Sequence, residues 1–110
     1  MDARELYTTF SSLIAYLKKQ HPNYDFAQET VCNMITLLLG QNIDQSIACL
    51  QSMNKEEIEW VAGSFTDLMA YHLNEEKSLK FLEYLNSLET AYPDSSCKHL
   101  IESAKEAYRF

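Results

Sequence analysis

Histidine, cysteine and acidic side chains are the groups in this chain that could form a metal site. Cys97 and His99 are two residues apart, and on a helix that spacing points their side chains in different directions. Zinc needs ligands that converge on one point, so this pair does not predict a zinc site. His72 and Glu76, four residues apart, could form one edge of a metal site. Position 72 also continues an apolar stripe, which favours a partly buried, hydrogen-bonded histidine instead.

Covalent catalysis would require an activated nucleophile. A reactive cysteine needs a nearby base and a positive environment that lowers the pKa of its thiol. Cys32 and Cys49 lie in an acidic stretch of the chain, which disfavours the thiolate. No Gly-x-Ser-x-Gly motif is present, and the two glycines, Gly40 and Gly63, are too few for a phosphate-binding loop. We therefore expect no enzyme: no catalytic residue, no metal and no cofactor.

An acidic and aromatic segment, residues 54–73, carries the strongest functional signal. At about 100° per residue, Trp60 and Tyr71 fall on the side of this helix that lies opposite its apolar stripe. Tryptophan and tyrosine are common anchors of protein interfaces, and carboxylates around them select a basic partner. The sequence therefore predicts a partner-binding surface with further carboxylates at the ends of the segment: Glu56, Glu57, Glu59, Trp60, Asp67, Tyr71, Glu75 and Glu76.

A second interpretation of the same residues stays open. A helix in the middle of a stack is covered on two sides, so Trp60 and Tyr71 can equally pack against neighbouring helices. The predicted apolar stripe of this helix consists of Ile58, Val61, Phe65, Leu68 and His72.

The chain is acidic, and its charge is unevenly distributed. Nine Lys and Arg against sixteen Asp and Glu give a net charge of −7. Residues 20–76 contain nine acidic residues and one basic residue, Lys55, and carry −8, whereas the remaining residues carry +1. Phosphate contacts need cations, so this balance argues against nucleic-acid binding. An acidic field attracts basic proteins, although acidic residues also simply keep small proteins soluble.

The elements that carry these residues are predicted to be helices. Two glycines and two prolines are too few for the turns of an all-β domain. Apolar residues recur at three- and four-residue spacings, and Asn54 and Asn74 are typical helix caps. We expect one compact all-α domain, residues 1–110, of about six antiparallel helices in a bundle or a stack of helical hairpins. The expected helices are residues 3–20, 25–39, 43–53, 55–73 and 75–92, and one after a cap at Asp94 or Ser95.

Two of these helices have specific local predictions. Asn54 with Glu57 three residues later predicts a capping box at the start of the fourth helix. The second helix is expected to end at Leu39, with Gly40 directly after its C-cap. Its inward-facing residues are predicted to be Phe26, Thr30, Met34, Leu37 and Leu38.

The cysteines and the N-terminus suggest a cellular compartment. Three cysteines are an odd number and lie beside apolar residues, which favours buried free thiols over disulfides. No basic region followed by an apolar core opens the chain, so we expect no signal peptide. The longest purely apolar runs are far shorter than the ~20 residues of a membrane span. We therefore expect a cytoplasmic protein without membrane contact.

Short stretches of the second half together resemble a known family. They are Glu57-Ile58-Glu59-Trp60-Val61, Phe65-Thr66-Asp67-Leu68, Phe81-Leu82, Leu85-Asn86-Ser87-Leu88, Ala91-Tyr92-Pro93 and Ile101-Glu102-Ser103-Ala104. Over residues 57–108 the chain resembles the small α-helical immunity proteins of bacterial contact-dependent growth inhibition. It departs from that pattern at Thr66, where the family has Glu, and at Thr90-Ala91, where a charged residue is usual.

The resemblance implies a non-enzymatic inhibitor that binds a cognate nuclease toxin, with an EndoU-like RNase as the first choice, and covers its active site. Such toxins are basic because they bind RNA, so an acidic inhibitor surface is physically reasonable. The partner we expect is thus a basic protein toxin, bound 1:1. The alternative is a helical adaptor or regulatory protein that binds a partner peptide or protein in a groove.

Overall fold

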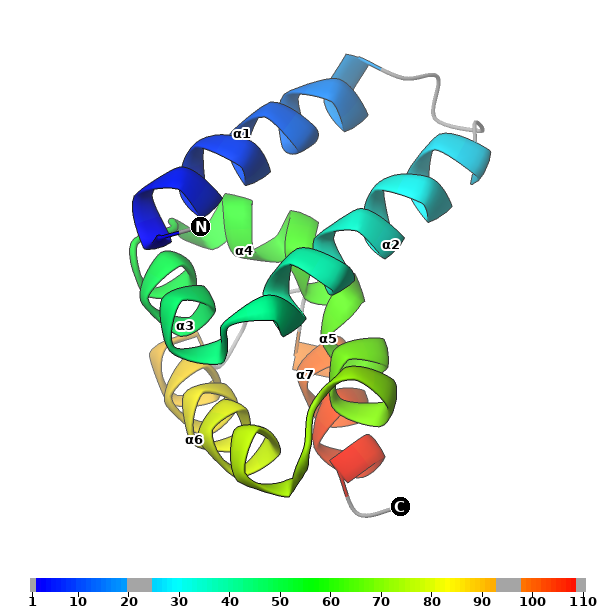
Figure 1. Cartoon of the computed structure of the whole chain (residues 1–110). Coiled ribbons are helices and arrows are strands. Elements are labelled where there is room, and N and C mark those ends of the chain that lie inside the picture. Colours follow the sequence, from blue (N-terminus) through cyan, green and yellow to red (C-terminus); the bar gives the residue numbers. More distant parts are fainter. Residues whose placement is uncertain (1, 20–24, 93–97, 109–110) are drawn as a thin grey trace.

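A computed structural model describes residues 2–19, 25–92 and 98–108, without the side chains of residues 25–27. All regular structure in these ranges is helical (Figure 1). The expected all-α fold of about six helices is confirmed, if four consecutive short stretches are counted as one middle segment (residues 55–72). The elements are α1 (Ala3–Lys19), α2 (Asp25–Gln41), α3 (Ile43–Gln51), α4 (Lys55–Val61), η1 (Ala62–Ser64), α5 (Phe65–Asp67), η2 (Leu68–His72), α6 (Glu75–Ala91) and α7 (Lys98–Tyr108).

Asparagine side chains begin three of these helices. The side-chain oxygens of Asn42, Asn54 and Asn74 accept hydrogen bonds from backbone N–H groups three residues later, at 3.2, 2.9 and 2.9 Å respectively. The Glu57 carboxylate also accepts a hydrogen bond from the Asn54 N–H at 3.1 Å, which completes the capping box. The caps predicted at Asn54 and Asn74 are therefore confirmed. The cap predicted at residues 94–95 lies outside the described residues.

Gly40 lies within α2, which continues to Gln41. A Cβ atom at Gly40 would lie 3.4 Å from the His72 Cβ and 3.6 Å from the Leu68 Cδ1. The absence of a side chain thus lets α2 come close to η2. The prediction that Gly40 follows the end of the helix was wrong, because this glycine allows close packing between helices rather than a reversal of the chain.

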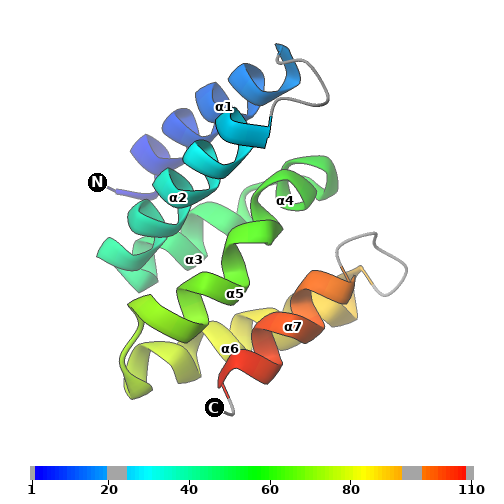
Figure 2. The ribbon, with the colours of Figure 1, turned by 90° about the vertical axis from the view of Figure 1, so that its right-hand side faces the viewer.

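The middle segment lies between two groups of helices (Figure 2). On one side are α1, α2 and α3, and on the other are α6 and α7. The segment contacts α1 through α4, α2 through η1 and η2, and α7 mainly through α5 and η2. The radius of gyration, 13.1 Å, equals the value of about 13 Å expected for a compact chain of this length. The middle segment therefore joins the two groups, which also contact each other directly through α3 and α6.

Phe65 is the central aromatic residue of the core. It is fully buried, and its ring meets those of Phe81 and Tyr84 edge to face, with centroids 5.2 and 6.5 Å away. Phe81 and Tyr84 lie 5.5 Å apart on α6, so the three rings connect the middle segment to that helix. The predicted stripe is buried at its first four positions, Ile58, Val61, Phe65 and Leu68.

α2 presents a different side to the core from the predicted one. Its core-facing apolar residues lie four positions apart: Val31, Ile35 and Leu39. Three residues predicted to point inward are instead exposed: Thr30, Met34 and Leu37. Leu38 is partly buried, and the side chain of Phe26 lies outside the described part of the structure. The prediction failed because apolar residues occur on almost every side of this helix, so their spacing alone does not select one side.

Phe65→Ala should lower the free energy of unfolding by about 3–5 kcal/mol, because it removes a fully buried ring and leaves a cavity. Tyr71→Ala is the matched control in the same segment. Its ring is 79% exposed, so we expect a change within about 0.5 kcal/mol. Urea unfolding followed by circular dichroism measures both values. Equal losses in the two variants would contradict the burial pattern described above.

Candidate functional site

The residues that the sequence singled out lie mostly on the middle segment, which is not a uniform α-helix. After α4, the 3₁₀ turn η1 winds the chain more tightly, and the π turn η2 winds it more widely. A projection at a constant angle per residue therefore does not hold along the whole segment. The direction of each side chain has to be taken from its observed burial.

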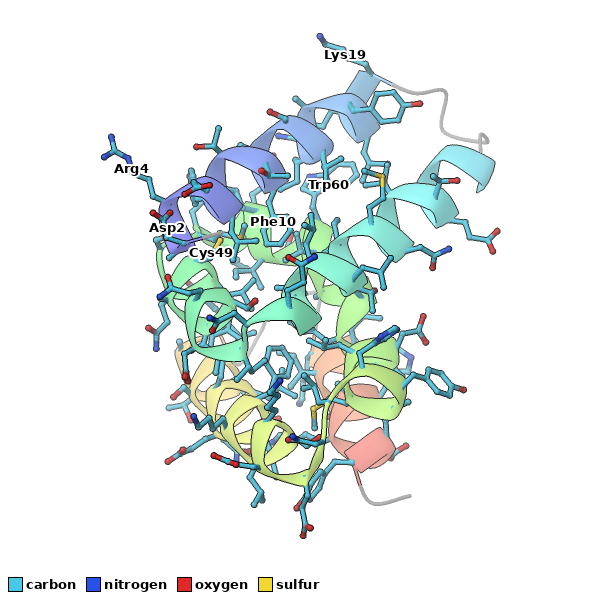
Figure 3. The ribbon with its side chains drawn as sticks, viewed as in Figure 1. Asp2, Arg4, Phe10, Lys19, Cys49 and Trp60 are labelled. Atoms are coloured by element: carbon cyan, nitrogen blue, oxygen red, sulfur yellow. The ribbon has the colours of Figure 1, made fainter. Side chains whose placement is uncertain are left out.

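The two aromatic residues of the predicted surface have different environments. Trp60 is partly buried and packs against the core. In Figure 3 its side chain points toward the space between α1 and α2. Tyr71, by contrast, is 79% exposed. Trp60 therefore fits the interpretation of a helix packed on two sides, and Tyr71 fits that of an exposed face.

Glu56 and Glu57 both interact with α1. The Lys18 Nζ lies 2.6 Å from the Glu56 Oε1 in an exposed ion pair. The Tyr7 hydroxyl donates a hydrogen bond to the Glu57 Oε2 at 2.8 Å, in addition to the capping bond described above. These two carboxylates attach α1 to the start of α4, so both have a structural role.

Glu57 also affects the ionisation of its neighbours. Its hydrogen bond is the largest cause of the raised pKa of Tyr7, because the bond requires the protonated phenol. Burial, with a smaller contribution from the Glu57 charge, raises the pKa of Cys49 to about 11. Burial likewise raises the pKa of Cys32. Both thiols are free, and their raised pKa values make them poor nucleophiles at neutral pH.

The remaining carboxylates of the predicted surface lie farther along the chain. Asp67, Glu75 and Glu76 are exposed, and Glu59 is partly buried. Glu75 and Glu76 occupy the first turn of α6, where negative charge interacts favourably with the helix dipole. The charge of Asp67 contributes to the raised pKa of Cys32, so Asp67 lies close to α2. Asp67 and Tyr71 are thus exposed together on the later part of the middle segment, whereas the exposed Glu56 at its start is paired with Lys18.

Basic residues are largely absent from this part of the chain. Residues 20–76 contain Lys55 and no other lysine or arginine. Arg4 and Lys19 project outward from the two ends of α1 (Figure 3). In the ranges that the structure describes, the ion pairs are Lys18–Glu56, Lys80–Asp44 and Lys105–Glu89. Within the same ranges, four predicted carboxylates therefore have no cationic partner: Glu59, Asp67, Glu75 and Glu76.

The exposed apolar residues of α2 were not predicted from the sequence. Leu37 is 58% exposed and Met34 is 44% exposed. The buried series Val31, Ile35 and Leu39 is also present in the sequence, and choosing it would have placed Leu37 toward solvent. The candidate surface therefore includes part of α2 as well as the middle segment.

His72 is exposed, so the prediction of a partly buried histidine was wrong. It is the last residue of the π turn and lies beyond the buried part of the stripe.

Among the described residues, no three His, Cys, Asp or Glu side chains are grouped closely enough to hold a metal ion. Cys97 lies outside those residues. Within the described parts of the chain, no helix has the length and apolar character needed to cross a lipid bilayer.

Comparisons of the chain with protein-family models, with curated proteins and with solved structures give no match.

The contact between Tyr7 and Glu57 predicts a pH dependence of stability. Folding raises the pKa of Tyr7. The contribution of its hydrogen bond to the free energy of unfolding is therefore fully present below about pH 10, the pKa of a free tyrosine. This contribution is lost as the pH rises through the pKa of Tyr7 in the folded protein. Above about pH 10, wild-type stability should therefore fall more steeply with pH than that of Tyr7→Phe. Urea unfolding at a series of alkaline pH values measures the difference. The control variant Tyr71→Phe should follow the wild type, and parallel curves for Tyr7→Phe would contradict the prediction.

Proposed function

We propose that this chain is a cytoplasmic inhibitor of the immunity-protein type. It binds a basic nuclease toxin of contact-dependent growth inhibition, with an EndoU-like RNase as first choice, and covers the active site. The observation that carries the proposal is the set of carboxylates without a cationic partner among the described residues. Glu59 and Asp67 lie on the middle segment, Glu75 and Glu76 begin α6, and Tyr71 is exposed between them.

The electrostatics suit such a partner. A nuclease grips RNA with lysine and arginine residues, so its active-site cleft is positively charged. A surface that carries several carboxylates without a cationic partner attracts that cleft over a distance of about 8–10 Å at physiological salt. The attraction raises the association rate, and close ion pairs then slow dissociation.

The packing of the surface also supports inhibition by occlusion. Affinity improves when the binding surface is already ordered, because less conformational entropy is lost on association. The middle segment is held from both sides by α2 and α7, and Phe65 is fully buried beneath it. Trp60, packed against the core, supports this surface, and Tyr71 offers an exposed ring.

A helical adaptor that binds a peptide is the alternative, and one observation favours it. A groove of about 440 Å³ is lined by Ala3, Arg4, Tyr7, Thr8, Ala48 and Ser52, between α1 and α3. Four of its six lining side chains are small, so the chain of a bound peptide can approach the two helices closely there. Salt separates the two functions: steered binding to a basic nuclease slows strongly as salt is added, whereas binding of an apolar peptide barely changes.

The proposal is tested by co-expressing the chain in a bacterial host with each member of a panel of contact-dependent RNase toxin domains, EndoU-like domains first. We expect it to rescue growth against one member and to inhibit the purified domain at a 1:1 ratio. Calorimetry should then show binding about tenfold or more weaker for Trp60→Ala and Asp67→Lys, with helicity unchanged.

Glu102→Lys is the matched control, because it makes the same charge change at an exposed position of α7. It should have a much smaller effect than Asp67→Lys. No rescue and no binding across the panel would overturn the proposal. Equal weakening by the two lysine variants would show that net charge, and not this surface, determines binding.

A further inference from the structure

α2 and the middle segment pack side by side and run in the same direction (Figure 2). Near the start of the contact, the Ser64 hydroxyl donates a hydrogen bond to the carbonyl oxygen of Cys32 at 3.1 Å. Near its end, Gly40 lies against Leu68 and His72. On α2 the contacting residues therefore form a row, a line of residues four positions apart, at 32, 36 and 40. On the middle segment they form a row at 64, 68 and 72.

The neighbouring rows show which side of this contact faces solvent. On α2 the row one residue earlier is buried: Val31, Ile35 and Leu39. On the middle segment the row one residue later is buried at Phe65 and Met69. The rows on the other side of the contact are exposed. On α2 the row one residue later contains Asn33 and Leu37, and on the middle segment the row one residue earlier contains Gly63, Asp67 and Tyr71. Because the two helices run in the same direction, these two rows lie next to each other on one side of the contact.

Extending the row on α2 back by one helical turn adds Glu29, which is exposed. The α2–η2 face is therefore defined by Glu29, Asn33 and Leu37 of α2 and by Gly63, Asp67 and Tyr71 of the middle segment. The charge of Asp67 reaches Cys32 of α2, which independently places the two rows together.

The chemistry of this face is uneven along its length. Leu37 and Tyr71, 58% and 79% exposed, are the two most exposed large hydrophobic side chains among the described residues, and both belong to its far end. Two carboxylates, Glu29 and Asp67, also belong to the face. Neither α2 nor residues 56–76 contain a lysine or arginine. At Gly63, no atom from beyond its own stretch of backbone lies within 4 Å of the position that a Cβ would occupy, so a partner can approach the backbone there.

We propose that the α2–η2 face is the docking site for a cationic protein element that carries arginine. A guanidinium group stacks on the exposed Tyr71 ring and pairs with Asp67, while its aliphatic stem covers Leu37. A further basic residue along the element meets Glu29. This inference rests on the proposed function only in that it takes a basic protein as the partner.

Arginine fits this face better than lysine for a physical reason. Its planar, weakly hydrated guanidinium stacks on an aromatic ring and binds a carboxylate with two hydrogen bonds, whereas lysine carries a strongly hydrated point charge. An exposed tyrosine with a carboxylate four residues earlier on the same face can therefore distinguish the two cations. A purely acidic surface binds both through charge alone.

Two synthetic peptides, acetyl-hexaarginine amide and acetyl-hexalysine amide, test the inference on the full chain. Titrations into ¹⁵N-labelled protein, followed by two-dimensional NMR, report the affinity and the residues affected. We expect the largest shifts at Leu37, Asp67 and Tyr71, and about two- to fivefold tighter binding of the arginine peptide. Tyr71→Ala should bring the ratio of the two affinities to about one, while Asp67→Asn should weaken both peptides.

Each variant has a matched control elsewhere on the surface. Tyr16→Ala removes an exposed tyrosine from α1, and Asp44→Asn removes an exposed carboxylate from α3. Neither should change the preference for arginine. Shifts centred on another helix, or a preference for arginine that survives Tyr71→Ala, would overturn the inference.

The two proposals can fail separately. If a toxin domain binds the protein with unchanged affinity after Leu37→Ala and Tyr71→Ala, the proposed function stands and the α2–η2 face is not its site. If the peptides bind this face as described while no RNase toxin domain binds, the face is a docking site and the toxin assignment fails. Leu79→Ala on α6 is the control for Leu37→Ala, since both leucines are at least half exposed.

Discussion

The burial of the middle segment between two groups of helices is the constraint on which the rest of the structure depends. Phe65 and Leu68 are fully buried, and the segment contacts α2 on one side and α7 on the other. A segment covered on two sides in this way exposes only a narrow strip of its surface to solvent. The exposed strip is therefore fixed in direction by the core and is already ordered before any partner arrives.

The sequence predicted the features of this fold that depend on neighbours within one helical turn. Asn54 with Glu57 and the cap at Asn74 were predicted correctly, because a cap needs only a side chain and a backbone N–H three residues later. The buried positions Ile58, Val61, Phe65 and Leu68 were also predicted, because these apolar residues recur at three- and four-residue spacings along one side of the segment.

The features that depend on contacts between distant parts of the chain could not be predicted in this way. α2 has apolar residues on almost all sides, so only the position of its neighbours shows that Leu37 is exposed. The bond from Tyr7 to Glu57 spans fifty residues and uses a carboxylate that the sequence had assigned to the partner surface. The π turn at Leu68–His72 has no local sequence pattern of its own, so it could not be predicted either.

The very short connections between helices bear on how the chain folds. Asn42 alone separates α2 from α3, and Leu73 and Asn74 alone separate η2 from α6. Closing such small loops costs little entropy, and each helix finds a packing partner close by in the chain. We expect a domain built in this way to fold quickly, within the microsecond to millisecond range of helical proteins with mostly local contacts.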